Sequence, residues 1–148
     1  MKLSLLALVT VASATAIGER DIVFEARNFT ASCVPHSVMC FYSLNAFQPG
    51  TMDTLGYNCT ASDVGPNRGV LPEIKGGTCL PSSRTFDVVH TEGGMNVTIS
   101  VQVSRLSYTR GRHFIPNDQI QIIPGVTPTG DYTAYVGPKD FSLERIWD

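Results

Sequence analysis

The sequence has few charged residues, and it lacks the short motifs of several common enzyme classes. Only 16% of the 148 residues are charged, and 13 acidic residues stand against 11 basic ones. A chain with this balance has no excess of cations for general binding to polyanions such as nucleic acids. No G-x-S-x-G, H-E-x-x-H or Walker-type motif occurs in it. These absences argue against a nucleic-acid-binding protein and lower the expectation of an enzyme.

The first 16 residues have the composition of a secretory signal peptide. A positively charged start is followed by an apolar run over residues 3–12, and residues 14–16 (Ala-Thr-Ala) offer a small-x-small cleavage pattern. A competing pattern lies at residues 12–14, so the mature start is defined to within about two residues. The run is shorter than the about 20 residues of a membrane span, and no second run of that length follows. We predict a signal peptide over 1–16 and one secreted, soluble domain over 17–148.

Four cysteines follow the predicted leader, and an even number in an exported chain indicates two disulfides. Three pairings are formally open. Cys33 and Cys40 flank a stretch in which Pro35 favours a turn, so the most economical pairing joins these two and leaves Cys59 with Cys79. Loop closure would then contribute about 2.5 and about 3.3 kcal/mol. No C-x-x-C motif occurs, so we expect no metal site.

Hydrophobic residues alternate with polar ones almost everywhere the pattern can be read, which is typical of β-strands. The clearest case is residues 96–103, where Val97, Ile99, Val101 and Val103 are predicted to lie on one buried face. Residues 62–83 are the least regular part. Other strands are expected at residues 22–30, 38–47, 57–61, 85–90, 106–110, 119–123, 132–136 and 141–144.

Turn signals separate these predicted strands. They include Gln48-Pro49-Gly50, Gly65-Pro66-Asn67, Lys75-Gly76-Gly77, Glu92-Gly93-Gly94 and Pro124-Gly125. Eight or nine short strands at this spacing predict an all-β fold, namely a single-domain antiparallel β-barrel or sandwich stapled by two disulfides. We see no internal repeat and no linker.

Candidate catalytic residues are few. His36, His90 and His113 are far apart and show no metal-ligand spacing, so we expect them in turns or on strand surfaces. A glycosidase needs two carboxylates, and the sequence offers Asp87 with Glu92, or Asp140 with Glu144. Because 13 acidic residues produce accidental neighbours, a small carbohydrate-active hydrolase is only an alternative hypothesis.

Basic residues gather in one segment, residues 104–114. Arg105, Arg110 and Arg112 are interleaved there with Tyr108 and His113. At the end of a hairpin, such residues would form a small surface for anion binding or ring stacking. A solvated basic turn around the glycine at position 111 is the simpler interpretation. We name these five residues as a candidate partner-binding surface.

Three N-x-S/T sequences occur, at Asn28, Asn58 and Asn96. In an exported eukaryotic protein they would be acceptors for N-glycosylation. Asn58 adjoins a predicted half-cystine, whereas Asn96 follows the turn at residues 93–94. We therefore expect Asn96 to be the most accessible of the three.

Four stretches give the chain a resemblance to a known family. They are CVPHSVMC running into FYSLNAFQPG at residues 33–50, GGTC with SRTFDV at 76–88, FIPNDQI at 114–120 and YVGPKDF at 135–141. In this order they resemble the small secreted fungal proteins related to the major allergen of Alternaria, and particularly the hypersensitive-response elicitor branch. The resemblance spans about residues 22–144.

The resemblance implies a β-barrel without an enzymatic site or cofactor, secreted by a filamentous fungus and perceived by plants as a defence elicitor. It implies, as a partner, a host apoplastic protein such as a thaumatin-like pathogenesis-related protein. The disulfides of the elicitor branch agree with the pairing expected above. The allergen branch adds two further expectations, a flavonoid-like ligand and a covalent dimer, but no cysteine is left over here. The chain is expected to be a monomer or a non-covalent dimer.

Overall fold

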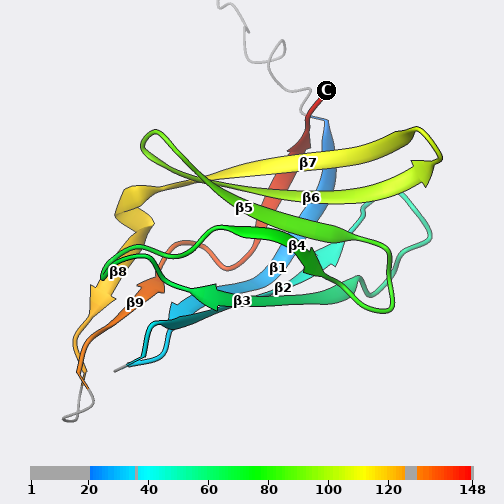
Figure 1. Ribbon diagram of the computed structural model, residues 1–148. Helices are drawn as coiled ribbons and strands as arrows, with labels where there is room; N and C mark the ends of the chain where they lie inside the picture. Colours follow the sequence, from blue (N-terminus) through cyan, green and yellow to red (C-terminus); the bar gives the residue numbers. More distant parts are fainter. Residues whose placement is uncertain (1–20, 36, 126–129, 148) are drawn as a thin grey trace, which may run out of the picture.

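A computed structural model describes residues 21–35, 37–125 and 130–147 (Figure 1). The predicted signal peptide and His36 lie outside the described residues. The strands are β1 (Ile22–Cys33), β2 (Met39–Phe47), β3 (Tyr57–Val64), β4 (Ile74–Thr78), β5 (Thr85–Thr91), β6 (Gly94–Ser104), β7 (Ser107–Pro116), β8 (Ile120–Ile123), β9 (Tyr132–Tyr135) and β10 (Phe141–Arg145). A short 3-10 helix, η1 (Asn117–Gln119), precedes β8.

Eight of these strands close into an antiparallel barrel. Their order is β10-β7-β6-β5-β4-β3-β2-β1, and pairing of β10 with β1 completes the ring. β1 is long enough to pair with two strands along one edge, with β10 through residues 22–26 and with β9 through Ser32. The hairpin of β8 and β9 therefore extends the sheet at one end of the barrel (Figure 1). The predicted all-β fold is confirmed, as a barrel.

Alternate residues of the strands fill the interior of the barrel. In β2 the buried positions are Cys40, Tyr42, Leu44 and Ala46. Aromatic rings cluster around Phe29, whose ring lies 6.2 Å from that of the buried Tyr42, 4.9 Å from that of Tyr135 and 5.3 Å from that of Phe141. The hydroxyl of Tyr42 donates to the carbonyl of Pro72 over 2.7 Å, and burial raises the pKa of Tyr42. The core is packed with side chains.

The two disulfides join Cys33 to Cys40 and Cys59 to Cys79, as the economical pairing predicts. Cys33 and Cys40 are also directly paired residues of β1 and β2. The second bridge connects β3 to the end of β4, two strands that share a single residue pair. It therefore closes the most weakly hydrogen-bonded seam of the barrel.

Two local predictions are wrong. Lys75-Gly76-Gly77 is not a turn but part of β4, an unpredicted strand, where a register shift leaves Gly76 with a φ of 74°. In β6, Val97 and Ile99 are buried, but Val103 is largely exposed. β5 ends its pairing with β6 at Ser100. The rest of β6 pairs only with β7, so it has no barrel interior to face.

Candidate functional site

The predicted basic segment lies on the hairpin of β6 and β7. Arg105 is in the connecting turn, and Tyr108, Arg110 and Arg112 occupy alternate positions of β7, so they share its outer face. The Arg110 guanidinium lies 4.8 Å from the centre of the Tyr108 ring. Arg112 is paired with Glu144 of β10 in the strand register. The structure thus confirms the hairpin and brings Tyr108 and Arg110 into contact.

His113, the fifth predicted residue, is on the other face of β7. Its ring stacks on that of Phe141, with 3.9 Å between centres and 14° between planes. Burial lowers the pKa of His113 below the ordinary value of 6.5. His113 is therefore part of the packing between β7 and β10, separate from the outer arginines.

A cleft of about 410 Å³ lies between the first disulfide and the hairpin of β8 and β9. Its apolar lining includes the Cys33–Cys40 bridge, Val38, Ile122 and Tyr132. At the same cleft Arg68 forms an ion pair with Asp131, and the Gly69 N–H donates to Thr133 Oγ1 over 2.9 Å. An apolar cleft with a few polar groups is typical of small-molecule sites. The sequence did not indicate this cleft, because its lining residues come from four separate stretches of the chain, within 33–40, 65–68, 122 and 131–133.

The carboxylate pairs offered by the sequence do not converge. Asp140 and Glu144 are four residues apart along extended chain, a separation of about 13 Å. Asp87 lies within β5, and Glu92 lies five positions further on, in the turn that follows β5. These are separations along the backbone, and they are longer than the roughly 5–10 Å between the two carboxyl groups of a glycoside hydrolase. Two of these carboxylates accept backbone hydrogen bonds, Asp87 from the N–H of Gly76 and Asp140 from that of Asn28.

In the part of the chain that the structure describes, no group of three or more His, Cys, Asp and Glu side chains is placed to hold a metal ion. Within the same residues, no helix has the length and apolar character needed to cross a membrane.

The three glycosylation sequences differ in exposure. Asn28 is exposed and has a φ of 54°, at a register shift of β1. Asn58 is also exposed, and its side-chain oxygen accepts from Asn45 Nδ2 over 3.2 Å. Asn96 is only half-exposed, because β6 has a neighbour on each side there. The expectation that Asn96 is the most accessible is therefore wrong.

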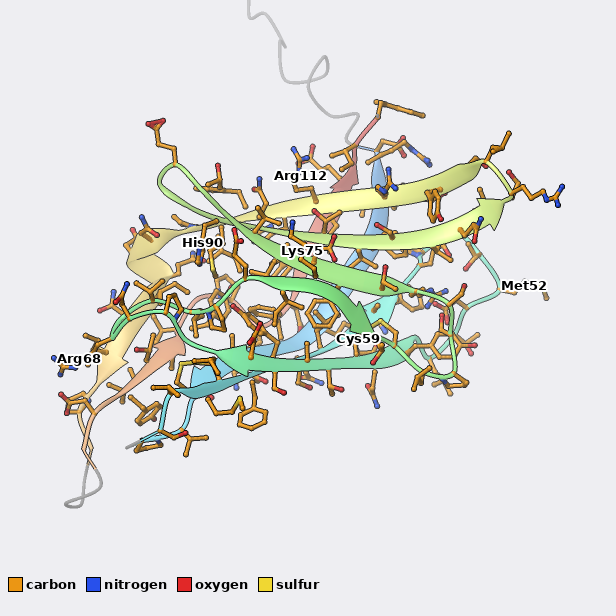
Figure 2. All side chains as sticks on the ribbon, in the orientation of Figure 1. Met52, Cys59, Arg68, Lys75, His90 and Arg112 are labelled. Atoms are coloured by element: carbon orange, nitrogen blue, oxygen red, sulfur yellow. A yellow bond between two sulfur atoms is a disulfide. The ribbon has the colours of Figure 1, made fainter. Side chains whose placement is uncertain are left out.

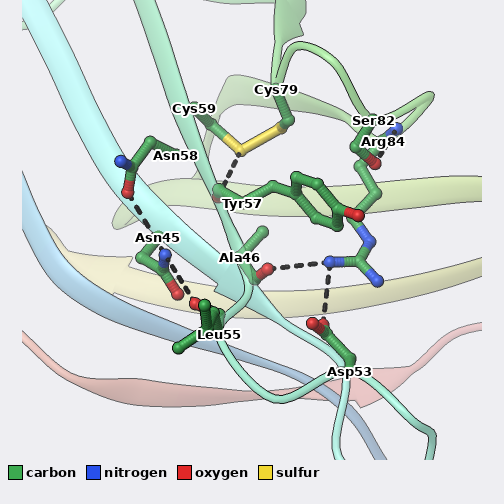
Figure 3. Close-up of a disulfide and its surroundings, with 10 residues drawn as sticks. All are labelled: Asn45, Ala46, Asp53, Leu55, Tyr57, Asn58, Cys59, Cys79, Ser82 and Arg84. Atoms are coloured by element: carbon green, nitrogen blue, oxygen red, sulfur yellow. Dashed lines mark hydrogen bonds and ion pairs between the residues drawn. A yellow bond between two sulfur atoms is a disulfide. The ribbon is translucent and has the colours of Figure 1, made fainter.

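Arg84 and Asp53 form a buried ion pair, which Figure 3 shows together with the Cys59–Cys79 disulfide. The sequence did not indicate this pair. Arg84 Nη1 donates to Asp53 Oδ2 and to the carbonyl of Ala46, each over 3.0 Å. The guanidinium lies 4.9 Å from the centre of the Tyr57 ring. Burial would raise the pKa of Asp53, but hydrogen bonds from the backbone of Gln48 and Gly56 and from Arg84 lower it overall. These contacts brace the loop of residues 48–56.

Comparison with known proteins identifies the fold but no family membership. No protein-family model matches the chain, and no curated protein matches it. The class defined by the structure is a small closed β-barrel with two disulfides, and a solved structure is similar to it in fold. This is the crystal structure of the Alternaria alternata major allergen Alt a 1, with a TM-score of 0.50 and 16% identity, covering 86% of this chain and 95% of that one. The chain therefore has an Alt a 1-like fold.

Proposed function

We propose that this protein is a secreted fungal effector or elicitor that acts by binding. In this proposal plants perceive it and mount a defence or hypersensitive response, and its partner is a host apoplastic protein such as a thaumatin-like pathogenesis-related protein. The leader-like sequence at residues 1–16 and the two disulfides support an extracellular location. The Alt a 1-like fold supports an allergen-like protein.

The observation that carries the proposal is the outer face of the β6–β7 hairpin. Part of this hairpin lies beyond the strands that flank it, so Arg105 and Tyr108 are exposed at its end, where the pairing of β6 and β7 shifts register between Gln102 and Ser104. Arg112 is exposed further along the same face. Guanidinium groups beside an aromatic ring bind carboxylates and other rings. A partner with an acidic patch is complementary to this face.

The test uses the oxidised mature protein and the triple variant Arg105→Ala/Arg110→Ala/Arg112→Ala. Each is used for capture from leaf apoplastic fluid and for leaf infiltration, with Lys75→Ala/Lys139→Ala as the control for lost positive charge. We expect the triple variant to bind the captured protein about tenfold more weakly or worse, with an unchanged circular dichroism spectrum, and the control to bind normally. Equal binding by all three proteins would remove the hairpin from consideration. No binding and no leaf response from the unaltered protein would refute the proposed function.

The 410 Å³ cleft supports a second candidate function, a carrier of a flavonoid-like small molecule. Tyr132 and Ile122 would contact the rings, and the Arg68–Asp131 pair would bind hydroxyl groups. Fluorescence titration with a flavonol tests this against the Tyr132→Ala variant. We expect saturable binding of the flavonol that the Tyr132→Ala variant weakens. Equal binding by the variant would show that the cleft is not the binding site. The hydrolase alternative gains no support from the carboxylate geometry.

A further inference from the structure

The two disulfides differ in how closely solvent approaches them. Cys33 is partly exposed, and both Cys33 and Cys40 line the cleft of about 410 Å³. Cys59 and Cys79 are each 0% exposed. Figure 2 shows Arg68, another residue of the cleft lining, at the left edge of the molecule, well away from the labelled Cys59. One bridge therefore borders an open cleft, whereas the other is enclosed by the core.

Little covers the first bridge on the side of the cleft. Gly65 lies against the sulfur of Cys40, since a Cβ added at Gly65 would be 3.0 Å from Cys40 Sγ. Gly65 lines the cleft and has no side chain to lay over the bridge. Thiol–disulfide exchange requires a thiolate to reach one of the two sulfur atoms, so its rate depends on this access. A small thiol that enters the cleft meets the requirement at Cys33, the partly exposed member of the pair.

We propose that the cleft is a modification site, at which a low-molecular-weight thiol of the glutathione class exchanges with the Cys33–Cys40 disulfide. The thiolate attacks Cys33 Sγ and forms a mixed disulfide with it. The electron pair of the broken bond goes to Cys40 Sγ, which takes up the proton that the incoming thiol lost. The exchange needs no other oxidant or reductant, and such S-thiolation is reversible.

The β1–β2 hairpin keeps the two cysteines together once the bridge is open. Cys33 and Cys40 are directly paired in the register of the two strands. Next to this pair, the Val34 N–H donates to the carbonyl of Met39 over 2.9 Å. The freed thiol of Cys40 has an acceptor in the carbonyl of Val38, 3.7 Å from its sulfur. The return to the disulfide therefore needs no rearrangement of the chain.

The cleft can also house the group that the exchange attaches. Its volume is in the range that holds small-molecule ligands. Arg68 and Asp131 form an ion pair in the lining, so this pair adds no net charge that would repel an anionic thiol. The attached group would occupy the space of a flavonoid-like ligand and exclude it. The inference does not depend on the proposed partner protein.

The experiment treats the oxidised mature protein with reduced glutathione at about 1–10 mM and about pH 8, where thiols are partly ionised. Free thiols are trapped with N-ethylmaleimide, and mass spectrometry of the digested protein assigns the state of each cysteine. The variant Val38→Trp fills the cleft. Its control is Val103→Trp, because Val38 and Val103 are 64% and 59% exposed but only Val38 is in the cleft lining. Both variants are checked for unchanged circular dichroism.

We expect glutathione on Cys33 and the maleimide on Cys40, at a rate about tenfold or more above that of Cys59 and Cys79. Val38→Trp should slow this exchange about threefold or more, and Val103→Trp should leave its rate unchanged. After free glutathione is removed, Cys40 should displace the bound glutathione and restore the bridge.

Three results would overturn the inference. The first is equal rates at the two bridges, which would mean that exchange takes place through the unfolded chain. The second is a Cys33–Cys40 bridge that does not react, or that carries glutathione mainly on Cys40. The third is an exchange rate that Val38→Trp does not change. If Val38→Trp does not fold, the comparison of the two bridges in the unaltered protein decides alone. Because no step uses a host protein, failure here is distinct from failure of the proposed function.

Discussion

Arg84 and Asp53 form an ion pair with a 3.0 Å contact between Nη1 and Oδ2, and their side chains are only 8% and 10% exposed. Removing one member of a buried pair leaves the other charge unpaired, at a cost of about 3 kcal/mol or more. We predict this loss in the unfolding free energy for Arg84→Met, measured by urea denaturation with both disulfides intact. Arg68→Met, which breaks the exposed pair with Asp131, should cost less than about 1 kcal/mol. Equal losses in the two variants would contradict the burial argument.

From the environment of Asp53 we also predict that the folded protein loses stability at low pH. Its pKa in the folded protein is below the ordinary value of 3.8, so the unfolded chain binds a proton more readily than the folded one. The stability that Asp53 contributes is therefore complete above about pH 4 and is lost as the pH falls through the folded pKa. Urea denaturation between about pH 2 and pH 6 should show this loss, and Asp53→Asn should flatten the profile. A profile that Asp53→Asn leaves unaltered would show that other carboxyl groups cause the acid sensitivity.

The disulfides should contribute unequally. They close loops with sequence separations of 7 and 20 residues. Loop-closure entropy then predicts a loss of about 2.5 kcal/mol for Cys33→Ala/Cys40→Ala and about 3.3 kcal/mol for Cys59→Ala/Cys79→Ala. The second variant should also lose the only covalent link across the weakly paired β3–β4 seam. Thermal unfolding would measure the order of the two losses, after mass spectrometry has shown that no free thiol remains; the reverse order would contradict the prediction.

The sequence predicts most of the barrel because alternation is a local property. Residues 96–100 show it, and Val97 and Ile99 are buried as expected. The prediction fails at β4, because Gly76 and Gly77 are typical of a turn but form a bulge inside a strand. It also fails at Val103, because alternation gives the face of a strand but not where the neighbouring strand ends.

In the candidate sites, too, local spacing predicts some features and leaves others unpredicted. The separation of His113 from the arginines follows from their odd and even positions in β7, so the sequence contained that signal. The pairs Arg84–Asp53 and Arg68–Asp131 join residues 31 and 63 positions apart. No local pattern marks such pairs, because they depend on how the loops fold back across the barrel.

Two adjacent glycines in β4 should differ in their tolerance of alanine. A Cβ at Gly77 would lie 2.3 Å from Phe86 Cε1, whereas a Cβ at Gly76 meets nothing within 4 Å. Gly76→Ala should therefore cost about 1–2 kcal/mol through its φ of 74° alone. Gly77→Ala should cost up to about 3 kcal/mol, because the Phe86 ring is fully buried and has to move. The check is urea denaturation of both variants, and a smaller loss for Gly77→Ala would mean that the core accommodates the methyl group.

The stack of His113 on Phe141 predicts a second pH dependence, near neutrality. Burial lowers the pKa of His113, so the unfolded chain, with an ordinary value of 6.5, takes up a proton before the folded protein does. Stability should be complete above about pH 6.5 and decrease on acidification toward the folded pKa, by less than about 1.4 kcal/mol per pH unit. NMR titration of the His113 ring gives that pKa directly, and His113→Gln should flatten the unfolding free energy between about pH 5 and pH 7, with the exposed His90→Gln as control. A folded pKa at or above 6.5, or a slope that survives His113→Gln, would show that burial against Phe141 does not disfavour the protonated ring.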